Sequence, residues 1–270
     1  MSDPIRETPA APQVLDIAGK RIAYHSTPGD EPGVVFFGGF MSDMAGTKAT
    51  ALEAWCRRRG RGFVRFDYTG HGRSSGTFTD GTIGGWTEDA AAVLDHLTRG
   101  PQVIVGSSMG GWIMVLAALM RPQRVAGLVG IAAAPDFTED LIAGGMTAEQ
   151  RAALERDGLC YLPDEAGNPC YPFTRALIED GRKHLVLRGK IPISCPVALV
   201  HGMLDQDVPF EISLKLAKAL ASDDVTITLV KDGTHTMSEP KHLPYIFAAL
   251  ESVLEKVGPH GAARSARKPA

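Results

Sequence analysis

The stretch Pro101-Gln-Val-Ile-Val-Gly-Ser-Ser-Met-Gly110 decides the fold. Its apolar centre, Val103-Ile104-Val105, is typical of a buried strand, and the apolar residues that follow, Gly110–Met120, predict a helix. The residues between them match Gly-x-Ser-x-Gly, the sharp strand-to-helix turn that exposes a serine hydroxyl at the edge of a sheet. Because the pattern fixes only small residues, its position between a strand and a helix is what makes it informative.

The register of this turn selects Ser108, and not Ser107, as the candidate nucleophile. Gly106 and Gly110 relieve crowding where larger side chains would collide. An ordinary β–α turn, or a loop that cradles phosphate, is the alternative interpretation. A P-loop needs Gly-Lys-Ser or Gly-Lys-Thr, which this turn lacks, so we prefer the nucleophile.

Short apolar runs alternate with amphipathic stretches along most of the chain. The expected strands are 14–17, 21–25, 34–37, 62–66, 103–105, 125–132, 197–200 and 225–230, and the expected helices are 47–59, 86–97, 110–120, 147–156, 211–220 and 243–257. This alternation predicts an α/β fold, in which a mostly parallel central sheet is covered by helices on both faces. The first two strands would form a hairpin.

The chain is expected to form one α/β domain over residues 13–257. Its alternating pattern stops between about 136 and 191, where glycines and prolines such as Pro163 and Pro169 accumulate. We interpret this part as an inserted cap over the carboxyl ends of the strands, where such sheets bind ligands. Residues 1–12 are expected to be a flexible leader, and residues 258–270 a disordered tail.

A serine hydroxyl needs a base within hydrogen-bond reach, and eight histidines are available. His235 is the candidate, because it follows the expected strand 225–230 and therefore lies at the carboxyl edge of the sheet. His201 and His242 are the competing residues. His201 stands at a strand end and can have a packing role, and His242 is already at the start of the last helix.

An acid must orient the histidine and stabilise its cation. Asp205 follows the expected strand 197–200, and Asp207 is its competitor. We prefer Asp205 because it is nearer the strand end, whereas Asp207 can cap the next helix. The order Ser108, Asp205, His235 is the order in which hydrolases with this turn carry their three groups.

The anionic oxygen of a tetrahedral intermediate needs two donors that are already in place. One would be the backbone N–H of Met109, directly after the nucleophile. The other would come from the turn Gly38-Gly39-Phe40, and we assign it to the N–H of Phe40. The alternative is that this glycine turn only changes the direction of the chain, and the turn can have both roles. His71, in a second glycine-rich loop, is expected to be a surface or structural histidine.

Composition narrows the classes of partner. A net charge of -3 gives no basic field, so no nucleic-acid partner is expected. The four cysteines show no CxxC pair or zinc spacing, which favours reduced thiols, with a Cys160–Cys170 bridge as the alternative. We expect no metal and no organic cofactor. No targeting segment and no transmembrane stretch is evident, so a cytoplasmic location is expected, and the oligomeric state stays open.

Four stretches resemble a known family. They are Gly39-Phe-Met-Ser-Asp-Met-Ala-Gly-Thr-Lys-Ala49, Arg65-Phe-Asp-Tyr-Thr-Gly70, the segment Gly100–Trp112, and Cys195-Pro-Val with His201-Gly-Met-Leu-Asp205. Together they resemble the α/β-hydrolase superfamily and, within it, the mitochondrial acyl-glucuronide esterases and palmitoyl-protein thioesterases. The resemblance runs from about Val34 to Leu250, but many superfamily members carry His-Gly where this chain has Gly38-Gly39.

The resemblance implies the α/β-hydrolase fold and serine hydrolysis of esters or thioesters, with Ser108, Asp205 and His235 on the matching positions. A small molecule or an acylated protein would be the substrate. Apolar cap residues can hold an acyl chain or simply pack on the core; they are Leu141, Ile142, Met146, Leu154, Leu159, Tyr161 and Phe173. The alternatives are a non-catalytic relative that binds a ligand or partner, and an acyltransferase or peptidase with the same three groups. Dehalogenases and epoxide hydrolases of this fold need Asp where this chain has Ser108.

Overall fold

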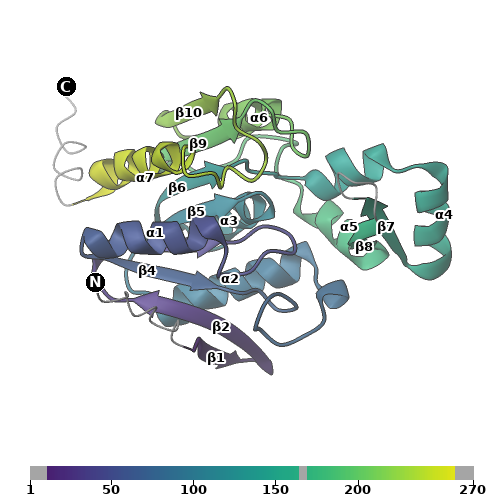
Figure 1. Ribbon diagram of the computed structural model, residues 1–270, viewed down its shortest axis with the longest axis horizontal. Helices are drawn as coiled ribbons and strands as arrows, with labels where there is room; N and C mark the ends of the chain where they lie inside the picture. Colours follow the sequence, from purple (N-terminus) through teal and green to yellow (C-terminus); the bar gives the residue numbers. More distant parts are fainter. Residues whose placement is uncertain (1–10, 164–168, 259–270) are drawn as a thin grey trace, which may run out of the picture.

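The computed structural model describes residues 11–163 and 169–258. Within them, eight strands form one sheet in the order β1-β2-β4-β3-β5-β6-β9-β10 (Figure 1). The strands are β1 (Gln13–Ile17), β2 (Lys20–Thr27), β3 (Asp30–Phe37), β4 (Arg61–Phe66), β5 (Gln102–Ser107), β6 (Val125–Ile131), β9 (Val197–Gly202) and β10 (Val225–Val230). The predicted hairpin is β1–β2, β2 pairs antiparallel with β4, and the other six strands of this sheet, β4, β3, β5, β6, β9 and β10, run parallel.

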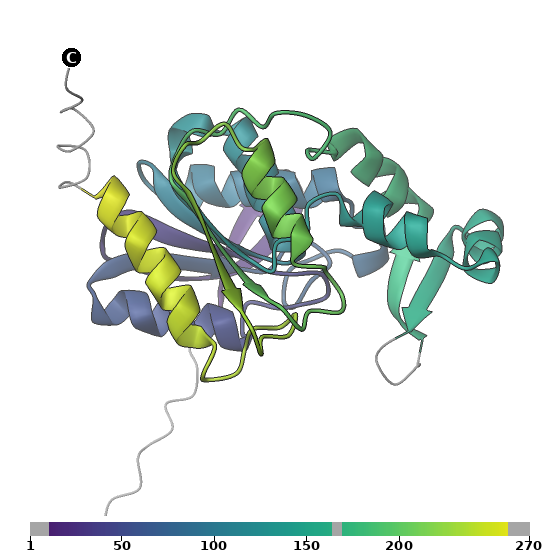
Figure 2. The same ribbon diagram turned by 90° about the horizontal axis from the view of Figure 1, so that it is seen from above.

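Helices cover both faces of this sheet, as predicted (Figures 1 and 2). The helices α1 (Thr47–Arg58) and α7 (Leu243–Val257) pack on one face, and α2 (Ile83–Leu97), α3 (Met109–Met120) and α6 (Glu211–Ala219) pack on the other. Successive side chains of a strand point to opposite faces, so Val34 and Phe36 join the first core while Val35 and Phe37 join the second. The predicted α/β-hydrolase architecture is therefore confirmed.

Residues between β6 and β9 leave the sheet and form an insertion. It contains η3 (Thr138–Ala143), α4 (Ala148–Asp157), a hairpin of β7 (Leu159–Pro163) and β8 (Pro169–Thr174), and α5 (Arg175–Gly181). The parallel strands point toward it in Figure 1, so the insertion lies at their carboxyl edge. The helix predicted at 147–156 is α4, which starts with a capping box between Thr147 and Gln150.

The hairpin β7–β8 was not predicted, because its prolines are typical of loops. The insertion is fixed to the body of the molecule by polar contacts with buried helices. Asp180 of α5 accepts the Gly84 N–H at the start of α2, at 2.7 Å, and Trp112 of α3 donates its indole N–H to the His184 carbonyl, at 3.0 Å. These contacts set the position of the insertion relative to α2 and α3.

The predicted leader and tail lie almost entirely outside the described residues, at 1–10 and 259–270. All four cysteines are free thiols, so the Cys160–Cys170 bridge is not formed. In the described part of the chain, no helix combines the length and the apolar character needed to cross a membrane.

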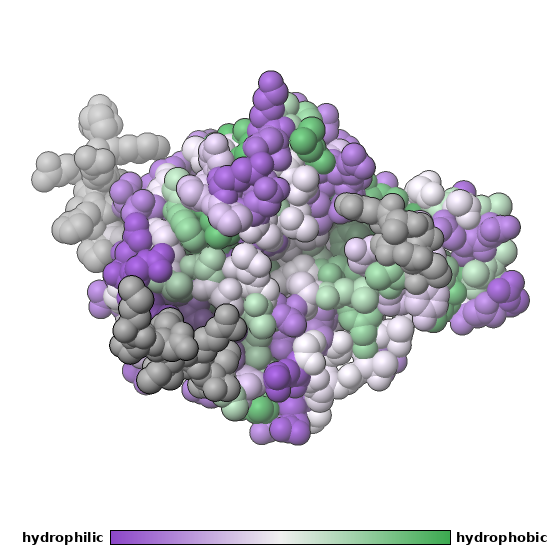
Figure 3. Space-filling view, in the orientation of Figure 1, coloured by the Kyte–Doolittle hydropathy of each residue, from purple (hydrophilic) through white to green (hydrophobic). Residues whose placement is uncertain are grey.

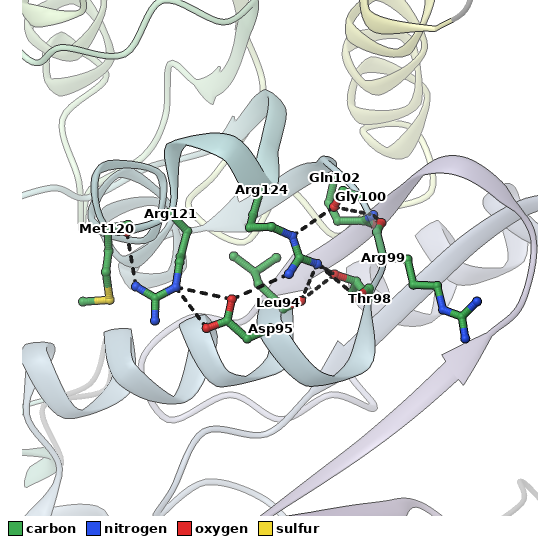
Figure 4. Close-up of polar contacts among 9 residues, drawn as sticks. All are labelled: Leu94, Asp95, Thr98, Arg99, Gly100, Gln102, Met120, Arg121 and Arg124. Carbon is green, nitrogen blue, oxygen red and sulfur yellow. Dashed lines mark hydrogen bonds and ion pairs between the residues drawn. The ribbon is translucent and has the colours of Figure 1, made fainter.

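Arg124, just before β6, closes the end of α2 (Figure 4). Its guanidinium donates to the carbonyls of Leu94 and Thr98 at 2.7 and 3.0 Å, and to the Gly100 carbonyl at 3.1 Å. The last carbonyls of a helix have no intrahelical donor and carry partial negative charge, so a cation there stabilises the helix.

We predict that Arg124→Met lowers the free energy of unfolding by about 1–2 kcal/mol, because these carbonyls lose a charged donor. Arg121→Met is the matched control. Arg121 forms a half-exposed ion pair with Asp95, so its loss should cost about 0.5 kcal/mol or less. Urea unfolding measures both values, and equal losses in the two variants would contradict the capping role.

Candidate active site

Ser108 occupies a strained backbone position between β5 and α3, with φ 53° and ψ −120°. The turn is tight enough to forbid side chains on either side. A Cβ at Gly106 would lie 2.4 Å from the Gly110 carbonyl oxygen, and one at Gly110 would lie 2.2 Å from the carbonyl oxygen of Phe37. The glycines of the motif are thus required by close backbone approach, and Ser108 between them remains partly accessible.

The structure brings the three predicted polar residues together at the carboxyl edge of the sheet. His235, in the loop after β10, places its Nε2 2.9 Å from Ser108 Oγ. Its Nδ1 lies 2.8 Å from Asp205 Oδ2, in the loop after β9. Because an ionised carboxylate only accepts, Nδ1 of the neutral ring carries the proton and Nε2 is free to accept the serine proton.

The carboxylate of Asp205 is fully buried, at 0% exposure. Burial alone would raise its pKa, but hydrogen bonds from His201 and His235, the charge of His235 and the Val208 N–H outweigh burial and hold the pKa well below its usual range. Asp205 therefore stays ionised at neutral pH, which is the state that can stabilise an imidazolium.

The side chains of the competing residues Asp207 and His242 make no hydrogen bond to His235 or Ser108 among the described contacts. Asp207 is exposed, and its contact with Asp205 is made by its backbone N–H, at 3.0 Å. The helix that it was expected to cap, α6, begins after Phe210 without a side-chain cap. The buried ring of His242 precedes α7, with its Nε2 3.6 Å from Asp232 Oδ1.

His71 is a buried structural histidine rather than a surface one. Its ring packs against Tyr68, Phe78 and Trp86, and burial lowers its pKa. His71 is therefore part of the aromatic packing below the site.

Met109 follows Ser108 directly, and the turn that contains Phe40 lies beside it. Met109 is the first residue of α3, so its N–H has no acceptor within the helix. A Cβ at Gly39 would lie 3.4 Å from Ser108 Cβ, which places the turn before Phe40 directly against the serine. The Phe40 ring is fixed by the insertion, because it stacks on Phe173 of β8 with centroids 4.9 Å apart.

A cavity of about 500 Å³ opens at Ser108 and His235. Most of its apolar wall comes from the Phe40 turn and the insertion; these residues include Phe40, Phe137, Leu141, Ile142, Leu162 and Phe173. Its polar wall contains Ser42, Asp43, Thr47, Lys48, Asp207, Thr236 and Ser238. Figure 3 shows apolar side chains gathered where the insertion meets the body of the molecule. The volume and the mixed lining are typical of a small-molecule site.

Lys48, in the first turn of α1, is a residue of this site that the sequence analysis did not single out. Its ammonium donates to the Thr236 carbonyl and lies 3.4 Å from Ser238 Oγ, on the loop that carries His235. Burial lowers the pKa of Lys48 to about 8. The side chain ties α1 to the histidine loop, a contact across 188 residues of sequence that no local pattern records.

Ligand atoms of Asp205, Asp207 and His235 lie within 4.8 Å of one another, a spacing that can suit a metal ion. The Asp205 oxygens, however, already accept hydrogen bonds from His201, His235 and two backbone N–H groups. Because these donors occupy the carboxylate, we assign no metal to the cluster.

Several known proteins are similar to this chain in sequence. A family model described as serine aminopeptidase, S33 matches residues 31–158. The mitochondrial palmitoyl-protein thioesterase ABHD10 of mouse is 37% identical over 87% of this chain and 80% of its own length. The human protein of the same name is 35% identical over 87% of this chain and 77% of its own length. The chain belongs to the ABHD10 family of α/β-hydrolases.

Solved structures agree with this assignment. Alpha/beta hydrolase domain-containing protein 10 from mouse superposes with a TM-score of 0.85 at 35% identity, covering 92% of this chain and 100% of that chain. A putative hydrolase from Agrobacterium vitis S4 also gives 0.85, at 41% identity, covering 91% of this chain and 98% of that chain. The chain is therefore a hydrolase, as the sequence predicted.

The expected cytoplasmic location is wrong. The ABHD10 relatives are named mitochondrial, which points away from the cytoplasm. The error has a physical reason. Reduced thiols indicate a reducing environment but do not distinguish one such compartment from another. The residues that form the fold do not indicate the compartment either.

We predict that Gly110→Ala destabilises the protein by about 3 kcal/mol or more, because its Cβ would overlap the Phe37 carbonyl and the turn cannot yield. Gly145→Ala is the control, since a Cβ there meets nothing within 4 Å. That variant should stay within about 0.5 kcal/mol of the parent. Urea unfolding of both variants tests the prediction, and a Gly110→Ala protein as stable as the parent would contradict it.

Proposed function

We propose that this protein hydrolyses esters or thioesters through an acyl-enzyme on Ser108, with His235 and Asp205 completing a catalytic triad. The observation that carries the proposal is the continuous chain of hydrogen bonds from Ser108 Oγ through the His235 ring to Asp205, at 2.9 and 2.8 Å. These distances lie within the range that a nucleophile and its base need, with the base oriented by a third group.

In this mechanism, His235 Nε2 removes the proton of Ser108 as Oγ attacks the acyl carbonyl. Asp205, ionised and buried, stabilises the imidazolium that forms. The N–H groups of Phe40 and Met109 hold the tetrahedral oxyanion. His235 then gives its proton to the departing alcohol or thiol, and the same ring activates the water that releases the acid.

The position of His235 orients the substrate in the cavity. The leaving atom receives its proton from His235 Nε2, so the alcohol or thiol part lies on the polar side, near Thr236, Ser238 and Lys48. The acyl group then extends along the apolar wall. Relatives named palmitoyl-protein thioesterases support an acylated protein or a small acyl ester as the substrate class.

The insertion acts as a cap in this proposal. It supplies Leu141, Ile142, Leu162 and Phe173 to the apolar wall, and Phe173 also fixes the ring of Phe40. An acyl chain and the oxyanion turn are therefore held by the same segment.

Hydrolysis of p-nitrophenyl esters from acetyl to palmitoyl, together with an S-palmitoyl thioester, tests the proposed function. We expect Ser108→Ala to lose at least about three orders of magnitude in turnover while unfolding like the parent. Ser107→Ala is the register control and should keep most of its activity. Full activity in Ser108→Ala would contradict the proposal. No turnover and no reaction with a fluorophosphonate would favour a non-catalytic binding protein.

The family description also names an aminopeptidase, so an amino-acid p-nitroanilide belongs in the same assay. Amide cleavage would use the same triad, and its rate relative to the esters decides between the two chemistries. Ester or thioester turnover above amide turnover supports the proposal.

We further predict that Ile142→Trp, which fills part of the apolar wall, lowers kcat/KM for the palmitoyl ester more than about tenfold while the acetyl ester changes less than about threefold. Leu214→Trp is the control, because Leu214 is a partly exposed residue of α6 outside the cavity lining. Equal losses on both esters in Ile142→Trp would place the acyl chain elsewhere.

A further inference from the structure

Asp205 receives a hydrogen bond from a second histidine. We propose that His201 is a positioning residue for this reaction: as a neutral ring protonated on Nε2, it holds the Asp205 carboxylate in line with His235, and Ser213 fixes its tautomer. The inference rests on the proposed function, since it concerns the acid of the same triad.

The contacts of His201 are complete and buried. Its side chain is 0% exposed, at the penultimate residue of β9. Nε2 lies 3.1 Å from Asp205 Oδ2 and 2.9 Å from the Val208 carbonyl oxygen, and Nδ1 lies 2.7 Å from Ser213 Oγ. The ring therefore joins β9, the loop that carries Asp205, and α6.

These partners are compatible with only one protonation state of the His201 ring. Both neighbours of Nε2 are acceptors, so Nε2 must carry a proton. Among the described contacts, the buried Ser213 hydroxyl has His201 Nδ1 as its hydrogen-bond partner. A second proton on Nδ1 would leave that hydroxyl proton without an acceptor, which is costly in a buried position. The ring is thus neutral, and Nδ1 accepts from Ser213.

A neutral donor suits this position better than a cation. Asp205 acts on His235 through its full negative charge, and a lysine or arginine at the same distance would neutralise that charge. The dipole of an Nε2–H group fixes the orientation of Oδ2 and leaves the charge in place. It also completes the hydrogen bonding of the carboxylate, whose Oδ1 accepts from the N–H groups of Asp207 and Val208 at 3.0 and 2.8 Å.

The backbone of Val208 contacts both Asp205 and His201. Its N–H donates to Asp205 Oδ1, while its carbonyl accepts from His201 Nε2. The loop from β9 to α6 is therefore held by one ring at both its carboxylate and its backbone. A small rotation of Asp205 would misalign His235 Nδ1, and displacements of about 1 Å in such a chain can cost about 100-fold in rate.

The alternative is a core histidine that only stabilises the fold. His201→Leu, His201→Gln and Asp205→Asn, with the double variant His201→Leu/Asp205→Asn, separate the two roles. Glutamine can place an amide N–H near the position of Nε2 and an acceptor toward Ser213, whereas leucine keeps the volume and loses both. Each protein is assayed for kcat and KM on one ester, with its folded fraction measured by unfolding.

We expect His201→Leu to lower kcat about 10- to 100-fold with KM changed less than about twofold, and His201→Gln to recover to within about threefold of the parent. In the Asp205→Asn background, His201→Leu should cost less than about twofold more, because His201 acts through Asp205. Equal costs of His201→Leu in both backgrounds, or an unchanged kcat per folded protein, would overturn the proposal.

A measurement that does not require catalytic turnover tests the state of His201 independently of the proposed function. In protein labelled with ¹⁵N-histidine, NMR should show His201 as the neutral Nε2–H tautomer, the state that its three hydrogen-bond partners require. A doubly protonated ring or an Nδ1–H tautomer would overturn it. Lack of Ser108-dependent turnover in the parent would overturn the proposed function, and with it the positioning role, even where the NMR result holds.

Discussion

The backbone of Ser108 is the constraint on which the rest of the structure depends. At φ 53° the chain reverses from β5 into α3 within one residue, and only glycines fit at the neighbouring positions 106 and 110. The packing around it is equally tight, since a Cβ on Gly111 would lie 2.5 Å from that of Ala133, just after β6. A strained turn of this kind persists only where the surrounding structure holds it in place, and here the buried residues of β5 and α3 do so.

This turn aims one hydroxyl at the carboxyl edge of the sheet, and the order of the parallel strands brings the other groups to the same edge. The sheet runs β5, β6, β9, β10, so the loops after β9 and β10 open beside the elbow. Asp205 and His235 come from these two loops. Further contacts hold the two loops: His201 joins Asp205 to Ser213 of α6, and Lys48 of α1 donates to the loop that carries His235.

The insertion links the apolar wall of the cavity to the turn that lies beside Ser108. Phe173 of β8 stacks on Phe40, whose turn lies against Ser108. The Phe40 ring also packs edge to face with Phe78, Trp86 and Phe137. In the proposed mechanism this turn binds the oxyanion, and a turn that is already held by aromatic packing loses little entropy when it forms its transition-state contacts.

The sequence by itself determined the alternation of strands and helices, the register of the elbow and the residue types of the candidate triad. These properties depend on hydrophobic periodicity and on glycines a few residues apart, which local sequence records. Three features depended on the tertiary structure. His201 lies at the end of one strand and His235 follows another, and only the distance from His235 to Ser108, across 127 residues, distinguishes the candidate base.

The other two are the contacts of Lys48 and the hairpin β7–β8. The Lys48 contact spans 188 residues, and the hairpin forms despite prolines at both of its strands. Such contacts follow from how β-strands and helices pack in space, which a local pattern does not encode.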